Sequence, residues 1–524
     1  MDAAKESVWQ FEVASQDALE RFAADLAPSL RPGDVIALYG ALGAGKSTFA
    51  RALIRAIAAP QVIGEVPSPT FTLVQAYDLQ RLPVAHFDLY RLSDPGELDE
   101  LGFDDALEHD LVLIEWPEHA GATLPAGRLD LRLDPGGTPD ARQLRLTGHG
   151  PWAARLTRLR QIADFLKGAG WGEAARSFLH GDASNRAYER LVRGAERAVF
   201  MNAPRQPDGP PIRDGKSYSA LVHLAEDVRA FVAIAGELRR HDLSAPRIHA
   251  VDLEHGFVLL EDLGSDTLLD EAGRPDGARY GVAVDLLARM HSLDWPRQAP
   301  LGNGEHHILA DYSPAALQIE SELVLDWFAP AFARQLPEQA RAEFAALWQP
   351  LFASLERQRR VWTLRDFHSP NLIWLGWRGG LARIGLIDFQ DAVFGHPAYD
   401  LVSLIQDARI DMDAELMAGL YERYIAAARA DDAFDEAAFS AAFATLGAQR
   451  NTKILGIFTR LWRRDGKGAY LRHLPRIARY LARNLAHPAL EGLAGWYRRW
   501  LPCVFDPVAL AQIPGAAKPE QGER

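Results

Sequence analysis

This sequence has little cysteine, no long apolar run and no excess of positive charge. Its single cysteine, Cys503, excludes an intramolecular disulfide and a cysteine-based metal site. The formal net charge of −13 argues against a general surface for nucleic acid or anionic membrane, because such surfaces concentrate Lys and Arg. No apolar run of about 18 residues occurs, and residues 1–11 lack the apolar core of a signal peptide. We therefore expect a cytoplasmic protein with no membrane partner and no direct sequence-specific contact with nucleic acid.

A phosphate-binding motif, Gly-Ala-Leu-Gly-Ala-Gly-Lys-Ser, occupies residues 40–47. An apolar run at 35–39 predicts a buried strand before it, and residues 48–58 predict a helix whose N-terminus faces the anion. The glycines let backbone N–H groups wrap the phosphates of ATP, the lysine reaches the β and γ oxygens, and the serine ligates Mg²⁺. A glycine-rich turn without a ligand is the alternative, although every motif position is filled. The predicted nucleotide contacts are Gly40, Gly43, Gly45, Lys46, Ser47 and Thr48.

Two further apolar runs in this region end in acids, Asp88 and Glu115. In P-loop nucleotidases such acids hold Mg²⁺ directly or through water, whereas an acid that merely ends a strand in solvent is an equal alternative for each. A proline-rich segment upstream offers the hydroxyl of Thr70 to a nucleotide.

A second phosphoryl-transfer pattern lies at residues 364–390. Asp366 is followed five positions later by Asn371, and a short apolar strand further on ends in Asp388. This order suits a kinase, in which Asp366 accepts the proton of a substrate hydroxyl while Asn371 and Asp388 hold Mg²⁺ on the nucleotide. A single Asp–Asn pair would favour an ordinary loop, but both parts in this order favour a kinase.

The chain upstream of Asp366 is predicted to supply a second nucleotide-binding lobe. Residues 181–186 precede a β-rich stretch and are predicted to cover the ATP phosphates, with an ordinary turn as the alternative. An apolar strand ending at Glu261 suits an adenine-binding hinge, or equally a plain strand and turn. The strand at 198–202 lacks the phosphate-gripping Lys of protein kinases, for which Lys216 or Arg186 could substitute. The predicted contacts in this lobe are Gly181, Ser184, Asn185, Arg186 and Glu261.

A helical stretch at 311–328 carries several acids and an aromatic ring. A solvated acidic face is the usual explanation; the alternative is a sugar-binding wall, in which carboxylates bond hydroxyls and an indole stacks on the ring. Asp400, beyond the catalytic segment, is predicted to brace the loop rather than to act on substrate. The candidate substrate contacts are Glu320, Asp326, Trp327 and His368.

These patterns predict an α/β P-loop NTPase domain followed by an α+β bilobal domain of the protein-kinase type. The boundaries are set by turn-forming residues near 150 and by the positions of the motifs. The predicted segments are a P-loop ATPase domain at 1–150, a linker and helix at 151–175, a kinase small lobe at 176–265, a large lobe with the substrate site at 266–505, and a tail at 506–524.

The first domain resembles the TsaE family. The resemblance is carried, in order, by the motifs at 40–49, 68–74, 86–91 and 114–118. TsaE is the small ATPase of the bacterial machinery that makes tRNA threonylcarbamoyladenosine. The resemblance implies ATP hydrolysis that resets the TsaB–TsaD enzyme, with TsaB–TsaD-like proteins as partners. Carried over by position, it implies Lys46 and Asp88 as catalytic residues, Thr70 as a nucleotide contact near the γ-phosphate, and Glu115 as a metal ligand beside Ser47.

The rest of the chain resembles the aminoglycoside-phosphotransferase family, and more narrowly its AmgK-like members. The matching segments are 181–188, 260–264, 365–372, 387–391 and 455–461. AmgK-like proteins are anomeric kinases of N-acetylmuramate and N-acetylglucosamine in peptidoglycan recycling. The resemblance implies an amino-sugar substrate whose C1 hydroxyl is oriented by Asp366 for attack on ATP, which gives a sugar 1-phosphate. Leu364 stands where protein kinases carry a loop-bracing His.

The whole sequence therefore predicts a bifunctional protein that binds ATP at two separate sites. Three alternatives remain at this point. The second domain could be a kinase of choline or an aminoglycoside, or a degenerate kinase scaffold that regulates the ATPase. The first domain could be a generic P-loop regulator without a connection to tRNA.

Overall fold

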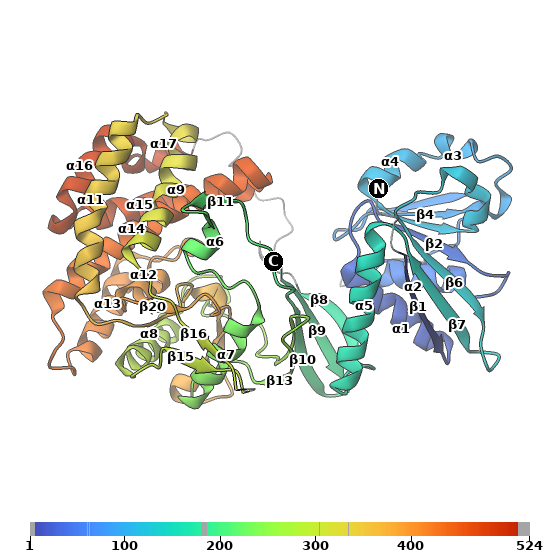
Figure 1. Cartoon of the computed structure of the whole chain (residues 1–524), viewed down its shortest axis with the longest axis horizontal. Coiled ribbons are helices and arrows are strands. Elements are labelled where there is room, and N and C mark those ends of the chain that lie inside the picture. Colours follow the sequence, from blue (N-terminus) through green and yellow to red (C-terminus); the bar gives the residue numbers. More distant parts are fainter. Residues whose placement is uncertain are drawn as a thin grey trace. The chain divides into compact units, whose positions relative to one another are not determined.

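The computed structural model describes residues 6–59, 61, 63–179, 186–302, 304–333 and 335–511, and its elements are labelled in Figure 1. Their contacts form two compact units: Met1–Pro204 with His249–Asp262, and Arg205–Ile248 with Leu263–Arg524. Within the described ranges, every helix is too short or too polar to span a lipid bilayer.

The first unit begins with a seven-stranded mixed sheet. Strands β2, β5 and β4 run parallel in the middle and are almost entirely buried, as their apolar sequences predict. Because parallel strands end at the same edge of a sheet, the residues that follow these three meet there. The strands, in spatial order, are β1 (Ser7–Val13), β7 (Arg142–Gly148), β6 (Leu129–Pro135), β2 (Val35–Tyr39), β5 (Leu111–Glu115), β4 (Val84–Asp88) and β3 (Val74–Tyr77).

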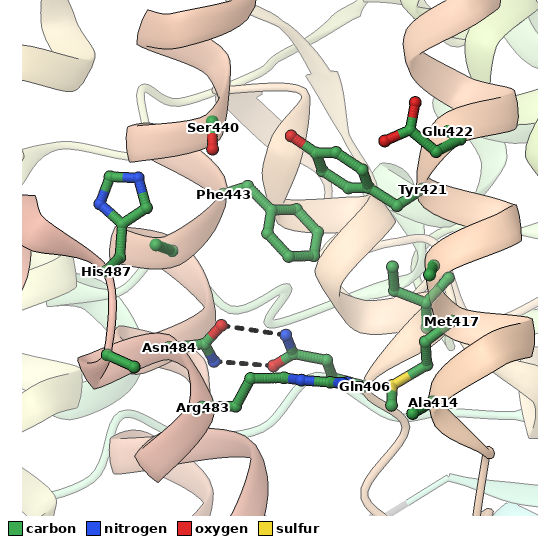
Figure 2. Close-up of a pocket in the computed structure, with 14 residues that line it drawn as sticks. Gln406, Ala414, Met417, Tyr421, Glu422, Ser440, Phe443, Arg483, Asn484 and His487 are labelled. Carbon is green, nitrogen blue, oxygen red and sulfur yellow. Dashed lines mark hydrogen bonds between the residues drawn. The ribbon is translucent and has the colours of Figure 1, made fainter.

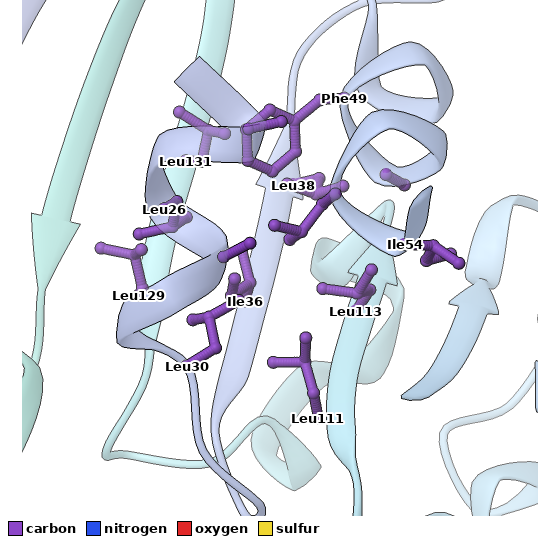
Figure 3. Packing of buried hydrophobic residues seen from close by; sticks show 14 of the residues in the cluster. Leu26, Leu30, Ile36, Leu38, Phe49, Ile54, Leu111, Leu113, Leu129 and Leu131 are labelled. Carbon is purple, nitrogen blue, oxygen red and sulfur yellow. The ribbon is translucent and has the colours of Figure 1, made fainter. Parts of the chain in front are cut away.

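Helices cover both faces of this sheet. On one face, α1 (Gln16–Leu26) and α2 (Lys46–Ala58) pack against Ile36, Leu38 and Leu113 (Figure 3). On the other face, the alternate strand residues pack with α3 (Glu97–Glu100) and α4 (Phe103–His109). The hydroxyl of Ser15 accepts a hydrogen bond from the backbone N–H of Ala18 and so caps the N-terminus of α1.

The first unit continues through α5 (Pro151–Gly168) into a five-stranded antiparallel sheet, whose apolar side chains pack against Ile162 and Leu166 of α5. The guanidinium of Arg176 in β8 lies 2.6 Å from a carboxylate oxygen of Glu189 and 3.9 Å from one of Asp25 in α1. The strands, in spatial order, are β13 (Ile248–Asp252), β14 (Phe257–Glu261), β10 (Glu196–Asn202), β9 (Ala187–Arg193) and β8 (Ala175–Leu179).

The second unit is mainly helical, with the long and largely buried α14 (Glu436–Asp465) at its centre. A Cβ added at Gly456 of α14 would lie 2.5 Å from the carbonyl carbon of Leu323, so the two backbones touch there. The other helices are α6 (Tyr218–Leu221), α7 (Val228–Arg240), α8 (Gly277–Ser292), α9 (Pro314–Leu323), α10 (Ala329–Phe332), α11 (Glu338–Glu356), α12 (Ala398–Ile405), α13 (Ala414–Ala428), α15 (Leu474–Leu485), α16 (Glu491–Trp500) and α17 (Pro507–Ala511).

Short antiparallel strand pairs join these helices and carry the kinase motif. The pairs are β11 (Pro211–Arg213) with β12 (Lys216–Ser217), β15 (Gln298–Pro300) with β16 (His306–Ile308), β17 (Val361–Thr363) with β20 (Val393–Gly395), and β18 (Leu372–Trp374) with β19 (Ile384–Leu386).

Candidate active sites

The first candidate site is the loop that connects β2 to α2. Gly40, Gly43 and Gly45 have φ angles of 141°, 77° and 109°, which glycine adopts at no steric cost. A side chain at Gly40 is also excluded by space, because its Cβ would lie 2.5 Å from the carbonyl oxygen of Leu133. The first N–H groups of α2 have no partner within the helix, so the loop and the helix start together offer donors to an anion.

Lys46 lies across this loop. Its ammonium donates hydrogen bonds to the carbonyl oxygens of Gly40 (2.7 Å) and Ala41 (3.0 Å). The same Nζ stands 3.6 Å from the centre of the Trp116 ring, a cation–π distance. Burial lowers the pKa of Lys46, against the opposing effect of nearby carboxylates. The hydrogen bonds and the ring contact together hold the positive charge of Lys46 above the loop between β2 and α2.

Glu115 connects the P-loop to the end of β5. One carboxylate oxygen accepts a hydrogen bond from the Ser47 hydroxyl at 2.8 Å, and the other lies 3.0 Å from Nε2 of His86. All three side chains lie at the edge where β2, β5 and β4 end. A hydroxyl and a carboxylate this close form a hard-oxygen pair of the kind that Mg²⁺ uses together with phosphates and water.

Asp88 stands opposite Glu115 in the parallel register of β4 and β5. Its carboxylate accepts hydrogen bonds from the Thr70 hydroxyl (2.9 Å) and from the backbone N–H of Tyr90 (3.1 Å). Thr48 follows in the first turn of α2 and is half-buried. The structure thus brings the P-loop, Thr70, Asp88 and Glu115 to one edge of the sheet.

The second candidate site is the loop around Asp366. Arg365 before it has a φ of 68°, an unusual conformation for a residue with a side chain. The buried carboxylate of Asp400 holds that conformation by accepting the N–H groups of Leu364 (2.7 Å) and Arg365 (2.9 Å). These bonds confirm the bracing role predicted for Asp400. The side chain of Asp366 remains 46% exposed.

A hairpin places Asn371 beside Asp388. The antiparallel pairing of β18 with β19 sets Leu372 opposite Leu386, so the residues at their open ends are neighbours. The Asn371 amide nitrogen donates to the backbone oxygen of Asp366 (3.0 Å) and lies 3.4 Å from a carboxylate oxygen of Asp388. With its nitrogen so engaged, the amide can present its oxygen next to the carboxylate, a pair that fits Mg²⁺.

Glu320 does not form part of a solvated or sugar-facing wall, and the structure corrects that prediction. Its side chain is completely buried in α9. One carboxylate oxygen is bonded by Arg365 and by Lys453 Nζ (2.8 Å), and the other by the Tyr312 hydroxyl and by Gln449 Nε2 (3.2 Å). Both oxygens therefore have two protein partners, and Glu320 anchors the catalytic loop through Arg365.

Several basic side chains surround Asp366. The closest approaches are those of His368 Nε2 at 4.0 Å and Arg450 Nη2 at 3.9 Å from the same carboxylate oxygen. Desolvation works against ionisation of Asp366, but His368, Lys453, Arg450 and Arg365 together lower its pKa. Asp366 is thus ionised at neutral pH and can accept a proton or a hydrogen bond from a hydroxyl.

The remaining candidate substrate residues lie on the turn after α9. Asp326 is exposed and accepts a hydrogen bond from Arg341 at 3.0 Å. Trp327 is half-buried within a single π-helical turn, Val324–Phe328, a feature frequent at functional sites. Lys216, the suggested replacement for the missing strand Lys, is exposed on β12.

The predicted phosphate loop of the small lobe is only partly described. Gly181, Ser184 and Asn185 lie outside the described residues. Arg186 immediately precedes β9, and Glu261 is the half-buried last residue of β14.

Sequence reasoning missed several groups that the structure brings to these sites. His86 contacts Glu115, and its position two residues before Asp88 on β4 was a usable signal, because alternate residues share a face of a strand. Trp116, which contacts Lys46, directly follows Glu115 within the segment 114–118. Lys453 and Arg450 gave no local signal. Each reaches its site from a distant part of the chain, so only the tertiary structure shows their contacts.

A separate cavity of about 360 Å³ lies among α12, α13, α14 and α15 (Figure 2). Tyr421 and Phe443 form part of its wall, and the paired amides of Gln406 and Asn484 lie on one side. Of the predicted site residues that the structure describes, none lines it.

Two kinds of nucleotide-handling fold are therefore present: a P-loop domain, and a kinase-like domain with an Asp–Asn–Asp loop. The chain is an ATP-using enzyme of the phosphotransferase class. Comparison with known families identifies it further. A model described as the phosphotransferase enzyme family matches residues 175–439, and one described as threonylcarbamoyl adenosine biosynthesis protein TsaE matches residues 13–144.

The chain belongs to the phosphotransferase enzyme family, and its N-terminal part to the TsaE family, which confirms both resemblances seen in the sequence. A Caulobacter vibrioides N-acetylmuramate/N-acetylglucosamine kinase is 41% identical over 352 residues, 65% of this chain and 96% of that protein. Its counterpart from Pseudomonas putida is 33% identical over 333 residues, 61% of this chain and 87% of that protein. A Rickettsia conorii tRNA threonylcarbamoyladenosine biosynthesis protein TsaE is 43% identical over 120 residues, 23% of this chain and 67% of that protein.

Proposed function

We propose that this chain is a bifunctional cytoplasmic enzyme with separate ATP sites. Its kinase part, at 176–265 and 266–505, phosphorylates the anomeric hydroxyl of N-acetylmuramate or N-acetylglucosamine in peptidoglycan recycling. Its ATPase part, at 1–150, supports tRNA threonylcarbamoyladenosine synthesis with TsaB–TsaD-like partners. The observation that carries the kinase proposal is the exposed Asp366 beside the Asn371–Asp388 pair, in a chain 41% identical to a kinase of these sugars.

In the kinase, Asp366 orients the C1 hydroxyl and accepts its proton as the hydroxyl oxygen bonds to the γ-phosphorus of ATP and the bond to the β–γ bridging oxygen breaks, which releases ADP. Its lowered pKa keeps the carboxylate ready for this role. Asn371 and Asp388 are the proposed holders of Mg²⁺, which supplies charge neutralisation to the phosphates when bound. Arg365, locked by Glu320 and Asp400, keeps Asp366 at the head of the loop.

In the ATPase, the loop glycines and Lys46 bind the phosphates. Ser47 and Glu115 are the proposed Mg²⁺ ligands, which the 2.8 Å contact between them supports. Asp88 and Thr70, bonded to each other, are the proposed groups that orient the water for attack on the γ-phosphate.

The kinase proposal is tested by supplying ATP with N-acetylmuramate, N-acetylglucosamine, choline and kanamycin. We expect sugar 1-phosphate from wild type and from Lys46→Ala, and none from Asp366→Ala. Equal phosphorylation of a 1-O-methyl glycoside would disprove the anomeric assignment. Phosphorylation of choline or kanamycin alone would favour the alternative substrates, and unchanged turnover in Asp366→Ala would place the activity elsewhere.

The ATPase proposal is tested with the full chain, TsaB and TsaD in a threonylcarbamoyladenosine-forming reaction on tRNA. Wild type and Asp366→Ala should sustain repeated turnover, whereas Lys46→Ala should not. Equal amounts of product with wild type, Asp366→Ala and Lys46→Ala would exclude the P-loop domain from this role.

A further inference from the structure

Arg450 of α14 is a buried cation with an incomplete set of partners. Only 5% of the residue is exposed, and its Nη1 is buried without a hydrogen-bond partner in the described part of the chain. The unmade hydrogen bond of a buried charged donor is costly. The other terminal nitrogen lies 3.9 Å from Asp366, too far for a hydrogen bond. Arg450 therefore does not fix the orientation of Asp366.

The other basic groups near Asp366 differ from Arg450. Burial lowers the pKa of His368, so its ring, which also faces Asp366, carries no positive charge at neutral pH. Arg365 and Lys453 both bond Glu320. Across the residues with described positions, the ion-pair partner of Arg450 is Asp366 itself. The cationic side of the Asp366 site is thus incompletely neutralised.

The backbone of α14 around Arg450 is held firmly. Asn451 donates to Gln406 (2.9 Å), which pairs with Asn484 through both of its amide atoms (Figure 2). At Gly447, one turn earlier, a Cβ would lie 2.6 Å from the Asn484 amide nitrogen, so the helices are in close contact. Arg450 is presented to the Asp366 site from a fixed helix, as specificity residues require.

We infer that Arg450 recognises the carboxylate that distinguishes N-acetylmuramate from N-acetylglucosamine, an inference that rests on the proposed function. The two sugars differ by a lactyl ether, which gives muramate one negative charge. Guanidinium groups pair with carboxylates through two parallel hydrogen bonds. The lactyl group is carried on C3 of the same ring whose C1 hydroxyl Asp366 orients in the proposed reaction, and Arg450 is the cation whose ion-pair partner among the described residues is Asp366.

The experiment compares kcat/KM for N-acetylmuramate, its neutral lactyl methyl ester and N-acetylglucosamine. Wild type should prefer the acid to the ester, which has nearly the same shape. Arg450→Met should lower kcat/KM for the acid by about 10- to 100-fold, and that for the two neutral sugars by less than about threefold. Arg450→Lys should recover part of the loss, because it restores charge without the two-pronged geometry. The matched control is Arg463→Met, which removes an exposed arginine from the same helix.

Equal losses for all three substrates in Arg450→Met would overturn the inference and make Arg450 a residue that positions Asp366. Equal kcat/KM of wild type for the acid and its ester would overturn it without any variant, whether or not Arg450→Met folds. Failure of wild type to phosphorylate any of the three sugars would instead refute the proposed function, and the inference with it.

Discussion

Substitution of Glu320 by glutamine tests whether this buried acid anchors the catalytic loop or touches substrate. The carboxylate neutralises both Arg365 and Lys453 inside the protein, where solvent cannot replace it. Burial opposes its ionisation, yet Lys453 and Arg365 lower the pKa of Glu320 below its ordinary value of 4.5. Glutamine keeps the shape but removes the charge, which leaves two buried cations without an acid. Breaking a buried ion pair in this way costs about 3–5 kcal/mol.

The assay is urea unfolding followed by tryptophan fluorescence at neutral pH. Glu322→Gln is the matched control, because Glu322 lies on the same helix but pairs with the partly exposed Arg213, a contact worth about 0.2–1 kcal/mol. The double variant Glu320→Gln/Lys453→Met should regain part of the lost stability, since one of the two cations is then gone. The free energy of unfolding that Glu320→Gln loses relative to wild type should become smaller as the pH falls below 4.5 and passes the folded pKa of Glu320. At such a pH wild type loses the same negative charge.

A variant Glu320→Gln as stable as Glu322→Gln would refute this reasoning. If such a variant also showed a raised KM for sugar, Glu320 would contact substrate, as the sequence pattern first suggested. Loss of stability without recovery in the double variant would show that the hydrogen bonds, rather than the balance of charge, are responsible.

Three further predictions concern other parts of the chain. Asp388→Asn should lower kinase kcat at least about 100-fold in a coupled ADP assay while ATPase turnover is unchanged; a smaller loss would remove Asp388 from the metal site. Gly456→Ala should cost about 1–3 kcal/mol in urea unfolding, because its methyl group would meet the backbone of Leu323; no loss would show that the two helices can separate. Burial raises the pKa of Asp25 to about 6 from 3.8, against the pull of Arg176, so stability falls as the pH rises between these values. Asp25→Asn should therefore exceed wild type by about 3 kcal/mol near neutral pH and match it at low pH; an equal difference at both would contradict the assignment.

Local sequence patterns were sufficient to predict site residues wherever the chemistry depends on residues close together in the sequence. The P-loop, the strand-ending acids Asp88 and Glu115, and the Asn371–Asp388 pair could be predicted because regular strand pairing brings such ends together. The comparison with relatives confirms the two families. The positions of these residues in the structure agree with the order of the two motifs along the chain.

Contacts between distant residues could not be predicted in this way. Glu320 looked like part of an acidic surface because the partners that neutralise it lie 45 and 133 residues further along the chain. Arg450 likewise lies outside the one segment of its helix, 455–461, that resembles a known family. A single sequence shows helical spacing but does not show which face of a helix meets a loop from another part of the fold.

The β18–β19 hairpin has a consequence for how this enzyme tolerates change in chain length. Register alone fixes the spacing of Asn371 and Asp388, whereas the turn near the exposed Trp377 only connects the two strands. A peptide tag inserted between Trp377 and Gly379 should be accepted. One extra residue within Ile384–Leu386 should abolish kinase activity, because it would turn the Asp388 carboxylate to the opposite face of the hairpin.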